Sequence, residues 1–256
     1  MAPTYVVGSR DRNPTATVAP HILSCLSAES GLRGRVLPQS EAPDASADLL
    51  DLTAGRQFQT ILADPPWRFQ NATGKVAPEH RRLNRYGTMT LADIKGLPVV
   101  QVAKASAHLY LWVPNALLPD GLAVLHAWGF AYKSNIVWHK LRKDGGSDGR
   151  GVGFYFRNVT ELLLFGVRGK NARTLPPGRS QVNIIQTRKR EHSRKPDEQY
   201  PVIEACSPGP YLELFARGLR PGWTTWGNQA NETYAPTWQT YAHHSRAGRS
   251  SEELAE

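Results

Sequence analysis

Apolar, strand-like runs alternate with helical patterns between about residues 56 and 230, and this alternation constrains the fold more than any other feature. Phe58–Ala63 (FQTILA) and Ala107–Pro114 (AHLYLWVP) are short apolar runs typical of buried strands. Leu117–Trp128, closed by Gly129, and Pro196–Ala205 have the spacing of helices. Strands separated by helices predict an α/β fold with a mostly parallel sheet and helices on both faces.

The weaker patterns complete this organisation. They predict a helix over Thr90–Ala105 with Thr90 as its N-cap, and strands at Lys133–Lys140, Thr160–Gly166, Asn183–Gln186, Tyr211–Ala216 and Thr224–Gly227. Residues 1–55 alternate small, polar and proline residues, and they predict a loosely ordered arm with one short helix around His21–Ala28. Residues 231–256 form a polar tail, so we expect the folded domain to span residues 56–230.

The basic residues are unevenly distributed. The chain has 31 Lys and Arg residues against 22 Asp and Glu residues, a net charge of +9. Between Lys140 and Lys195, 14 basic residues outnumber 4 acidic ones, so this segment carries the whole excess. A localised excess favours a nucleic-acid partner, because phosphates bind Lys and Arg. Within it, Arg188, Lys189 and Arg190 are adjacent in a loop-like stretch, and we expect them to contact phosphates.

Other features exclude several classes of protein. No window approaches the ~20 apolar residues that a membrane helix needs, and we expect no membrane partner. The N-terminus lacks a charged start followed by an apolar run, so we expect no secretory signal. Two cysteines, Cys25 and Cys206, exclude a disulfide scaffold and a four-cysteine zinc site. They fit a reducing cytoplasm, and we expect no metal.

The tetrapeptide Asp64-Pro65-Pro66-Trp67 directly follows the first strand, where ligands bind in parallel sheets. The two prolines fix the backbone and offer carbonyl oxygens without N–H donors, and an ionised Asp64 also only accepts hydrogen bonds. A rigid pair of acceptors, Asp64 and the Pro65 carbonyl, suits a planar ring that bears an amino group, with Trp67 stacked on that ring. A proline-rich turn beside a core tryptophan is the structural alternative.

This motif and those after it resemble the DPPW-type adenine N6-methyltransferases, which include the catalytic subunit of the eukaryotic messenger-RNA adenosine methyltransferase and many bacterial and phage DNA methyltransferases. The resemblance covers about Ile61 to Gln229. After DPPW come, in the family's order, YGTM, LYLWVPN, VWHK, GFYFRNVTELLLFGVRG, HSRKPDEQYPVIE, LELFAR and GWTTWGNQ. It implies a Rossmann-like class I fold that uses S-adenosylmethionine, in a permuted order with the catalytic motif before the cofactor motif. No G-x-G-x-x-G follows a strand.

The resemblance also implies roles for single residues. The catalytic motif is Asp64, Pro65, Pro66 and Trp67; substrate is held by Tyr86, Trp138 and Lys140; the cofactor is held by Asp64, Lys195, Glu213, Phe215, Arg217, Asn228 and Gln229. The stretch Gly145–Gly153 is implied to be a mobile loop that closes over the site. For each residue a bland alternative stays open: a solvated charge for Lys195 and Arg217, a polar strand end for Asn228, and packing for the aromatic residues.

The function expected from these residues is methyl transfer from S-adenosylmethionine to the N6 amino group of adenine in DNA, in the cytoplasm of a bacterial or phage-infected cell. An RNA adenosine methyltransferase is the alternative enzyme, and a catalytically silent nucleic-acid-binding subunit is the alternative class. The intact DPPW, KPDE and GNQ segments argue against silence. The chain has no zinc-finger Cys/His module and no RNA-binding motif, which favours DNA. The target sequence is not encoded in a recognisable motif, and a dimer is left open.

Overall fold

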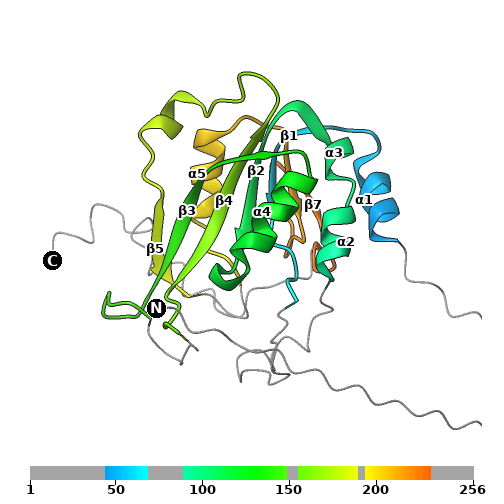
Figure 1. The fold of residues 1–256 in the computed structure, drawn as a ribbon. Coiled ribbons are helices and arrows are strands. Elements are labelled where there is room, and N and C mark those ends of the chain that lie inside the picture. Colours follow the sequence, from blue (N-terminus) through cyan, green and yellow to red (C-terminus); the bar gives the residue numbers. More distant parts are fainter. Residues whose placement is uncertain (1–43, 69–88, 149–154, 190–193, 232–256) are drawn as a thin grey trace, which may run out of the picture. The chain divides into compact units, whose positions relative to one another are not determined.

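A twisted sheet of seven strands forms the centre of the protein, for which a computed structural model describes residues 44–68, 89–148, 155–189 and 194–231 (Figure 1). The strands are β1 (Phe58–Ala63), β2 (Ala103–Val113), β3 (Ala131–Leu141), β4 (Thr160–Arg168), β5 (Ile184–Arg188), β6 (Tyr211–Leu214) and β7 (Trp223–Trp226). Their order is β5-β3-β4-β2-β1-β6-β7. Only β4 runs antiparallel to its neighbours, β2 and β3. The predicted α/β fold with a mostly parallel sheet is therefore confirmed.

Helices cover both faces of this sheet because the strands alternate their apolar side chains between the two. The helices are α1 (Ala45–Thr53), α2 (Leu91–Gly96), α3 (Val99–Val102), α4 (Leu118–Ala127) and α5 (Gln199–Cys206), with 3₁₀ turns η2 (Asn115–Leu117) and η3 (Pro176–Arg179). Side chains of α1 to α4 pack with Ile61 and Leu109 in one core, whereas α5 packs with Leu62 and Tyr110 in the other. Neighbouring residues of one strand thus serve opposite cores.

The predicted helix over Thr90–Ala105 is wrong in its second half. Thr90 does cap α2, and its side chain and that of Asp93 form a reciprocal capping box. The helix ends at Gly96, and after Pro98 only the short α3 follows before β2 begins at Ala103. Proline disfavours helical backbone in the residue before it, so the apolar spacing alone overestimated the helix.

Helix α1 is a second difference, because residues 45–53 were predicted to belong to a loosely ordered arm. Asp44 caps the helix by accepting the Ser46 amide, and Leu49 is fully buried in the core. The Trp226 indole N–H donates to Asp48 at 2.7 Å, which ties α1 to β7. Only one apolar stretch, Leu49 and Leu50, marks this helix in the sequence. The short helix expected at His21–Ala28 lies outside the described residues.

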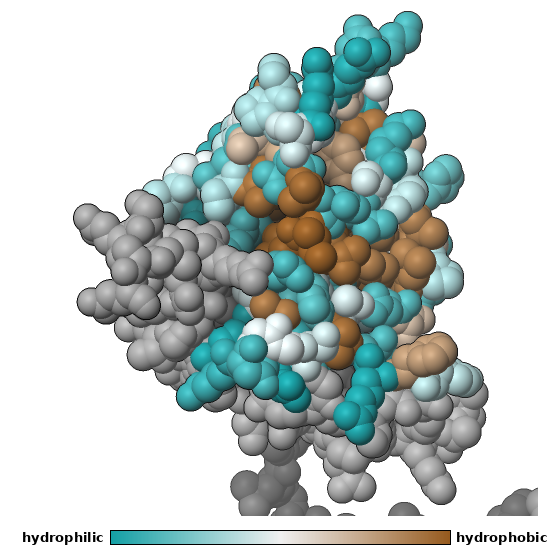
Figure 2. Space-filling model, turned by 90° about the vertical axis from the view of Figure 1, so that its left-hand side faces the viewer, coloured by the Kyte–Doolittle hydropathy of each residue, from teal (hydrophilic) through white to brown (hydrophobic). Residues whose placement is uncertain are grey.

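The sheet ends at β5, and the side of the molecule at this edge exposes apolar residues. Tyr132 on β3 is 43% exposed, and Val182 and Ile184 at β5 are 65% and 42% exposed. Figure 2, which views this side, shows hydrophobic residues (brown) gathered among hydrophilic ones. A dimer stays a prediction. Among the described residues, no helix is long and apolar enough to span a membrane.

Candidate active site

The DPPW motif lies at the carboxyl end of β1, as predicted, and the backbone fixes it there. The Trp67 amide donates to the Pro65 carbonyl at 2.8 Å, and the Met89 amide donates to the Pro66 carbonyl at 3.2 Å. The Pro65 oxygen, predicted to accept from a substrate amino group, therefore already accepts one hydrogen bond. A carbonyl oxygen has two lone pairs, so one stays available.

Trp67 does not serve as the predicted stacking surface in this structure. Its side chain is buried in the first core, with 6% of the residue exposed. Its indole N–H donates to the Trp112 carbonyl at 2.9 Å. This hydrogen bond holds the end of the motif against β2. Trp67 thus anchors the motif against β2 in this structure, and its stacking on a substrate ring stays a prediction.

A line of alternating charges starts at Asp64 and runs into the protein. The Lys195 ammonium lies 2.9 Å from Asp64 Oδ1 and 3.0 Å from Glu161 Oε1. The other oxygen of Glu161 lies 2.8 Å from the Lys140 ammonium. Asp64 is the most exposed of the four, with 26% of its side chain accessible, against 9–15% for the others. The line thus opens to solvent at the carboxylate of the catalytic motif.

Burial and these contacts shift the pKa values of the line. Burial raises the pKa of Asp64, and the Lys195 ammonium offsets part of that rise. For Glu161, burial also acts to raise the pKa, but the Lys195 and Lys140 ammonium groups outweigh it and lower the pKa to about 2. Burial opposes the charge of Lys195, yet the carboxylates of Asp64 and Glu161 raise its pKa above the ordinary value. Glu161 therefore stays ionised at neutral pH and helps to keep Lys195 charged.

A cavity of about 410 Å³ opens beside Asp64, between the ends of β1 and β6. Of the predicted cofactor residues, it is lined by Asp64, Lys195, Glu213, Phe215 and Arg217. Phe215 follows β6 with a φ of 62°, in the left-handed region that a phenylalanine rarely adopts. Its ring packs against Trp226 at 5.3 Å between centroids. The backbone at this corner is held in a costly conformation at the cavity wall.

A second carboxylate of the cavity, Glu213, is held by Tyr200. The Tyr200 hydroxyl lies 3.0 and 3.1 Å from the two oxygens of Glu213 and donates to the carboxylate. The Arg220 guanidinium lies 3.3 Å from the centroid of the Tyr200 ring. Burial raises the pKa of Glu213 to about 7, although Tyr200 and Arg220 act to lower it. Glu213 therefore presents a hydrogen-bond acceptor near neutral pH.

Other predicted residues lie elsewhere. Trp138 is 2% exposed in the second core and donates its indole N–H to Thr187 Oγ1 at 2.9 Å, so it packs in the core here, and its contact with substrate stays a prediction. The Lys140 ammonium forms a salt bridge with Glu161. Asn228 is exposed and does not line the cavity, whereas the Gln229 carbonyl accepts the Gly218 amide at 2.6 Å beside it.

Arg188, Lys189 and Arg190 were predicted to contact phosphates from a loop, but this triplet begins within a strand. Arg188 is the last residue of β5, and the Lys189 ammonium lies 3.0 Å from Asp148 Oδ2, whose side chain is fully buried. Arg190 and Tyr86 lie outside the described residues, as does most of the predicted mobile loop, of which residues 145–148 are described. The described part begins as a tight turn in which the Arg142 amide donates to the Gly146 carbonyl.

The sequence analysis missed Glu161 and Tyr200. Glu161 stands at the start of the apolar strand TELLLFG, and a carboxylate in such a run is a signal of a buried ion pair, because an unpaired one is too costly there. Tyr200 carries no comparable signal, because helix spacing alone does not tell which strand its hydroxyl meets. Within the described residues, no group of three or more His, Cys, Asp or Glu side chains is placed to hold a metal ion.

The sheet order, the acceptor motif after β1 and the cavity at β6 are features of the class I methyltransferase fold. Comparison with known sequences specifies the class further: the MT-A70 family model matches residues 58–229, and the chain belongs to this family. It is 30% identical to the N(6)-adenosine-methyltransferase catalytic subunit METTL3 of Homo sapiens over 242 residues, 87% of this chain and 36% of that protein. It is 27% identical to the Type II methyltransferase M.MunI of Mycoplasma sp over 194 residues, 67% of this chain and 77% of that protein.

A plant relative shows the same pattern of coverage. The probable N(6)-adenosine-methyltransferase MT-A70-like of Oryza sativa is 33% identical over 179 residues, 68% of this chain and 23% of that protein. The chain thus spans about a third or less of the adenosine methyltransferases but about three quarters of the Mycoplasma protein. The residues matched by the family model include Asp64, Glu161, Lys195 and Glu213.

Proposed function

We propose that the protein transfers a methyl group from S-adenosylmethionine to the N6 amino group of adenine in DNA. The observation that carries the proposal is the Asp64 carboxylate, exposed at the mouth of the cavity and backed by Lys195. A carboxylate fixed at this point accepts a hydrogen bond from the target amino group and stabilises the positive charge that develops on its nitrogen. The free lone pair of the Pro65 carbonyl is the second acceptor.

The cavity fits S-adenosylmethionine by the chemistry of its lining. Lys195 and Arg217 are the cations for a carboxylate, Glu213 is the acceptor for ribose hydroxyls, and Phe215 offers aromatic surface. When bound, this cofactor supplies an electrophilic methyl group. The chain's own part is positioning: Lys195 holds the Asp64 carboxylate in place, and Glu161 keeps Lys195 charged.

DNA is favoured over RNA by the coverage of the Mycoplasma relative. The chain matches 77% of the Type II methyltransferase of Mycoplasma, so the alignment covers most of that protein. The adenosine methyltransferases, by contrast, are covered by 36% and 23%. The alternative of RNA adenosine as substrate rests on their higher identity of 30% and 33%.

The test incubates the full chain with labelled S-adenosylmethionine and adenine-containing duplex DNA, single-stranded DNA or RNA, followed by nucleoside analysis. We expect N6-methyladenine in DNA from the parent and none from Asp64→Asn. If N6-methyladenine formed only in RNA, the substrate would be RNA adenosine and not DNA. Cofactor and nucleic-acid binding with no product on any substrate would assign the silent subunit instead.

A further inference from the structure

A second group of cations lies at the end of the sheet opposite Asp64. Arg56 precedes β1 and Lys104 is the second residue of β2, so both lie where these strands begin. Strand β4 runs antiparallel to β2, with Arg168 paired to Ala107, and its end therefore returns to the same edge (Figure 1, top). We call the following residues the basic edge: Arg56, Lys104, Arg168, Lys170 and Arg173.

The turn after β4 is fixed against the start of β2, which keeps these cations together. Gly169 has a φ of +80°, and a Cβ there would lie 2.1 Å from the Ala105 carbonyl oxygen. Three residues further on, the backbone meets β2 again, where His108 Nε2 lies 3.2 Å from the Ala172 carbonyl oxygen. The Ser106 hydroxyl contacts the Lys170 carbonyl at 3.5 Å. The basic edge is thus part of the rigid fold.

The cations of the basic edge differ from those of the active-site end in their pairing. Lys140, Lys189 and Lys195 each lie within 3.0 Å of a carboxylate. Among the described residues, no carboxylate forms a salt bridge with any member of the basic edge. Arg56 and Arg168 donate only to backbone carbonyls. Unneutralised cations held on one rigid edge attract a polyanion.

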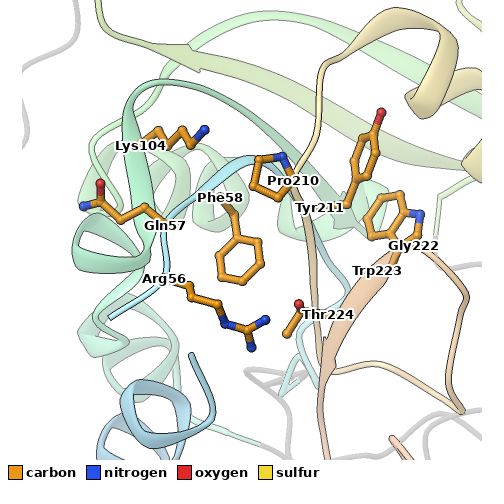
Figure 3. Close-up of a pocket in the computed structure, with 9 residues that line it drawn as sticks. All are labelled: Arg56, Gln57, Phe58, Lys104, Pro210, Tyr211, Gly222, Trp223 and Thr224. Atoms are coloured by element: carbon orange, nitrogen blue, oxygen red, sulfur yellow. The ribbon is translucent and has the colours of Figure 1, made fainter. Parts of the chain in front are cut away.

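A hollow of about 420 Å³ lies within this edge, and Figure 3 shows its lining. Arg56 and Lys104 border it, and Pro210 and Tyr211 supply apolar and aromatic surface, whereas Phe58, also in the lining, is buried. The Tyr211 ring stacks on Trp223, with 4.8 Å between centroids and 24° between planes. The nearby carboxylate of Glu204 accepts the Trp223 indole N–H at 2.7 Å. Aromatic surface on the same hollow as two cations suits a base and its flanking phosphates.

We propose that the basic edge binds the phosphodiester backbone of single-stranded nucleic acid, with one base in the hollow, independently of methyl transfer. The inference goes beyond the proposed function, because this edge lies far from Asp64. The six residues of β1 separate the two ends by about 17 Å at roughly 3.3 Å per residue. A short substrate that fills the active site does not reach this edge, whereas a long strand can contact both.

The first experiment maps the surface without requiring activity. Surface lysines of the full chain are acetylated with and without a long oligothymidine, which contains no adenine, and the modified sites are identified by mass spectrometry. We expect the oligonucleotide to protect Lys104 and Lys170, while Lys95, an exposed lysine of α2, stays reactive. Equal modification of Lys104 and Lys170 in both samples would overturn the proposal.

The second experiment measures the salt dependence of oligothymidine binding by the variant Lys104→Gln/Lys170→Gln/Arg173→Gln. Each lost phosphate contact lowers the slope of log affinity against log salt by about 0.7 on single strands, so we expect a decrease of about 2 if all three contact phosphates. Lys95→Gln is the matched control and keeps the parent slope. An unchanged slope in the triple variant contradicts the proposal.

Two further readouts separate this inference from other outcomes. Methyl transfer to a short adenine oligonucleotide stays unchanged in the triple variant, and a changed slope in a chain without any transferase activity would still support the basic edge. The same variant is tested on vesicles of phosphatidylcholine and phosphatidylserine. Loss of vesicle binding with unaltered oligonucleotide binding would assign the edge to a lipid surface and overturn the proposal.

Discussion

At the scale of single residues, the active site depends on a row of alternating charges, each of which is paired with its neighbour in space. Lys140, Glu161, Lys195 and Asp64 are joined by contacts of 2.8–3.0 Å, and all but Asp64 are largely shielded from water. Removing one member leaves a buried charge without its partner, which costs several kcal/mol in stability. Substitutions that keep the shape of a side chain therefore separate its role in the reaction from its role in the fold.

Asp64→Asn tests the acceptor at the mouth of the cavity. The amide keeps the shape of the carboxylate but loses its charge, so stabilisation of the developing positive charge is lost. We expect a decrease in the transfer rate on the order of 10²-fold or more, with cofactor binding largely retained. Single-turnover rates and calorimetry measure the two effects. Asp144→Asn, in an exposed pair with Arg142, is the control, and a rate for Asp64→Asn within a few-fold of the parent would disprove the assignment.

The raised pKa of Glu213 predicts that the stability of the fold decreases as pH rises. Burial raises the pKa of its carboxyl from 4.5 to about 7, so between these values the folded chain binds a proton that the unfolded chain has released. The contribution of Glu213 to the free energy of unfolding therefore falls as pH rises from 4.5 to about 7, by up to about 3 kcal/mol. Urea denaturation across this range should show the fall in the parent but not in Glu213→Gln. Parallel pH profiles would refute the raised pKa.

At the scale of elements, α1 and the break before β2 show how short segments join the core. Helix α1 places Leu49 in the first core, while Leu52 on the same helix is 43% exposed. The break at Pro98 lets β2 begin early enough to pair Ala103 with Phe58. In both cases one buried contact, and not helical propensity, decides the element.

Leu49→Ala should destabilise the domain by about 2–5 kcal/mol, because it leaves a cavity in a fully closed core. Leu52→Ala is the matched control on α1 and should change the free energy of unfolding by less than about 1 kcal/mol. Chemical denaturation of the full chain measures both values. Similar small losses in the two variants would mean that α1 does not belong to the cooperative unit.

At the scale of the whole molecule, the charge excess is divided between two ends of the sheet. At the active-site end, several cations of the segment between Lys140 and Lys195 are paired with carboxylates of the same segment, among them Asp148 and Glu161. At the other end, the basic edge carries cations without such pairs among the described residues. The net charge of the segment therefore overstates the charge at its active-site end.

Neutralising Arg188, Lys189 and Arg190 together tests whether the cations at the active-site end bind phosphates. We expect binding to weaken similarly for all sequences, because phosphate contacts carry no base information. Each phosphate contact contributes about 0.9 to the slope of log affinity against log salt on duplex DNA. Because Lys189 is paired with Asp148, we expect the slope to decrease by less than three such contacts would give. A salt titration decides it. The parent slope in the variant would show that the triplet only solvates the surface.

The sequence by itself determined the fold class, the position of the catalytic motif and the family. Strand-like runs such as Phe58–Ala63 are recognisable because burial on both faces requires apolar residues at successive positions. Asp64 was located because a parallel sheet presents the carboxyl ends of its strands at one edge. Of the cavity residues, Lys195, Glu213, Phe215 and Arg217 followed from the resemblance; they line the same cavity as Asp64, and their contact with a cofactor stays a prediction.

The tertiary structure alone decided which side chains meet. The sequence does not tell that Glu161 of β4 joins Lys140 of β3 to Lys195, because strand order and register bring these distant positions within 3.0 Å. It also does not tell an exposed tryptophan from a buried one, and Trp67 and Trp138 are buried since the core covers both. Pairing of charges depends on distance in space, so the active site and the basic edge become distinct only in the folded chain.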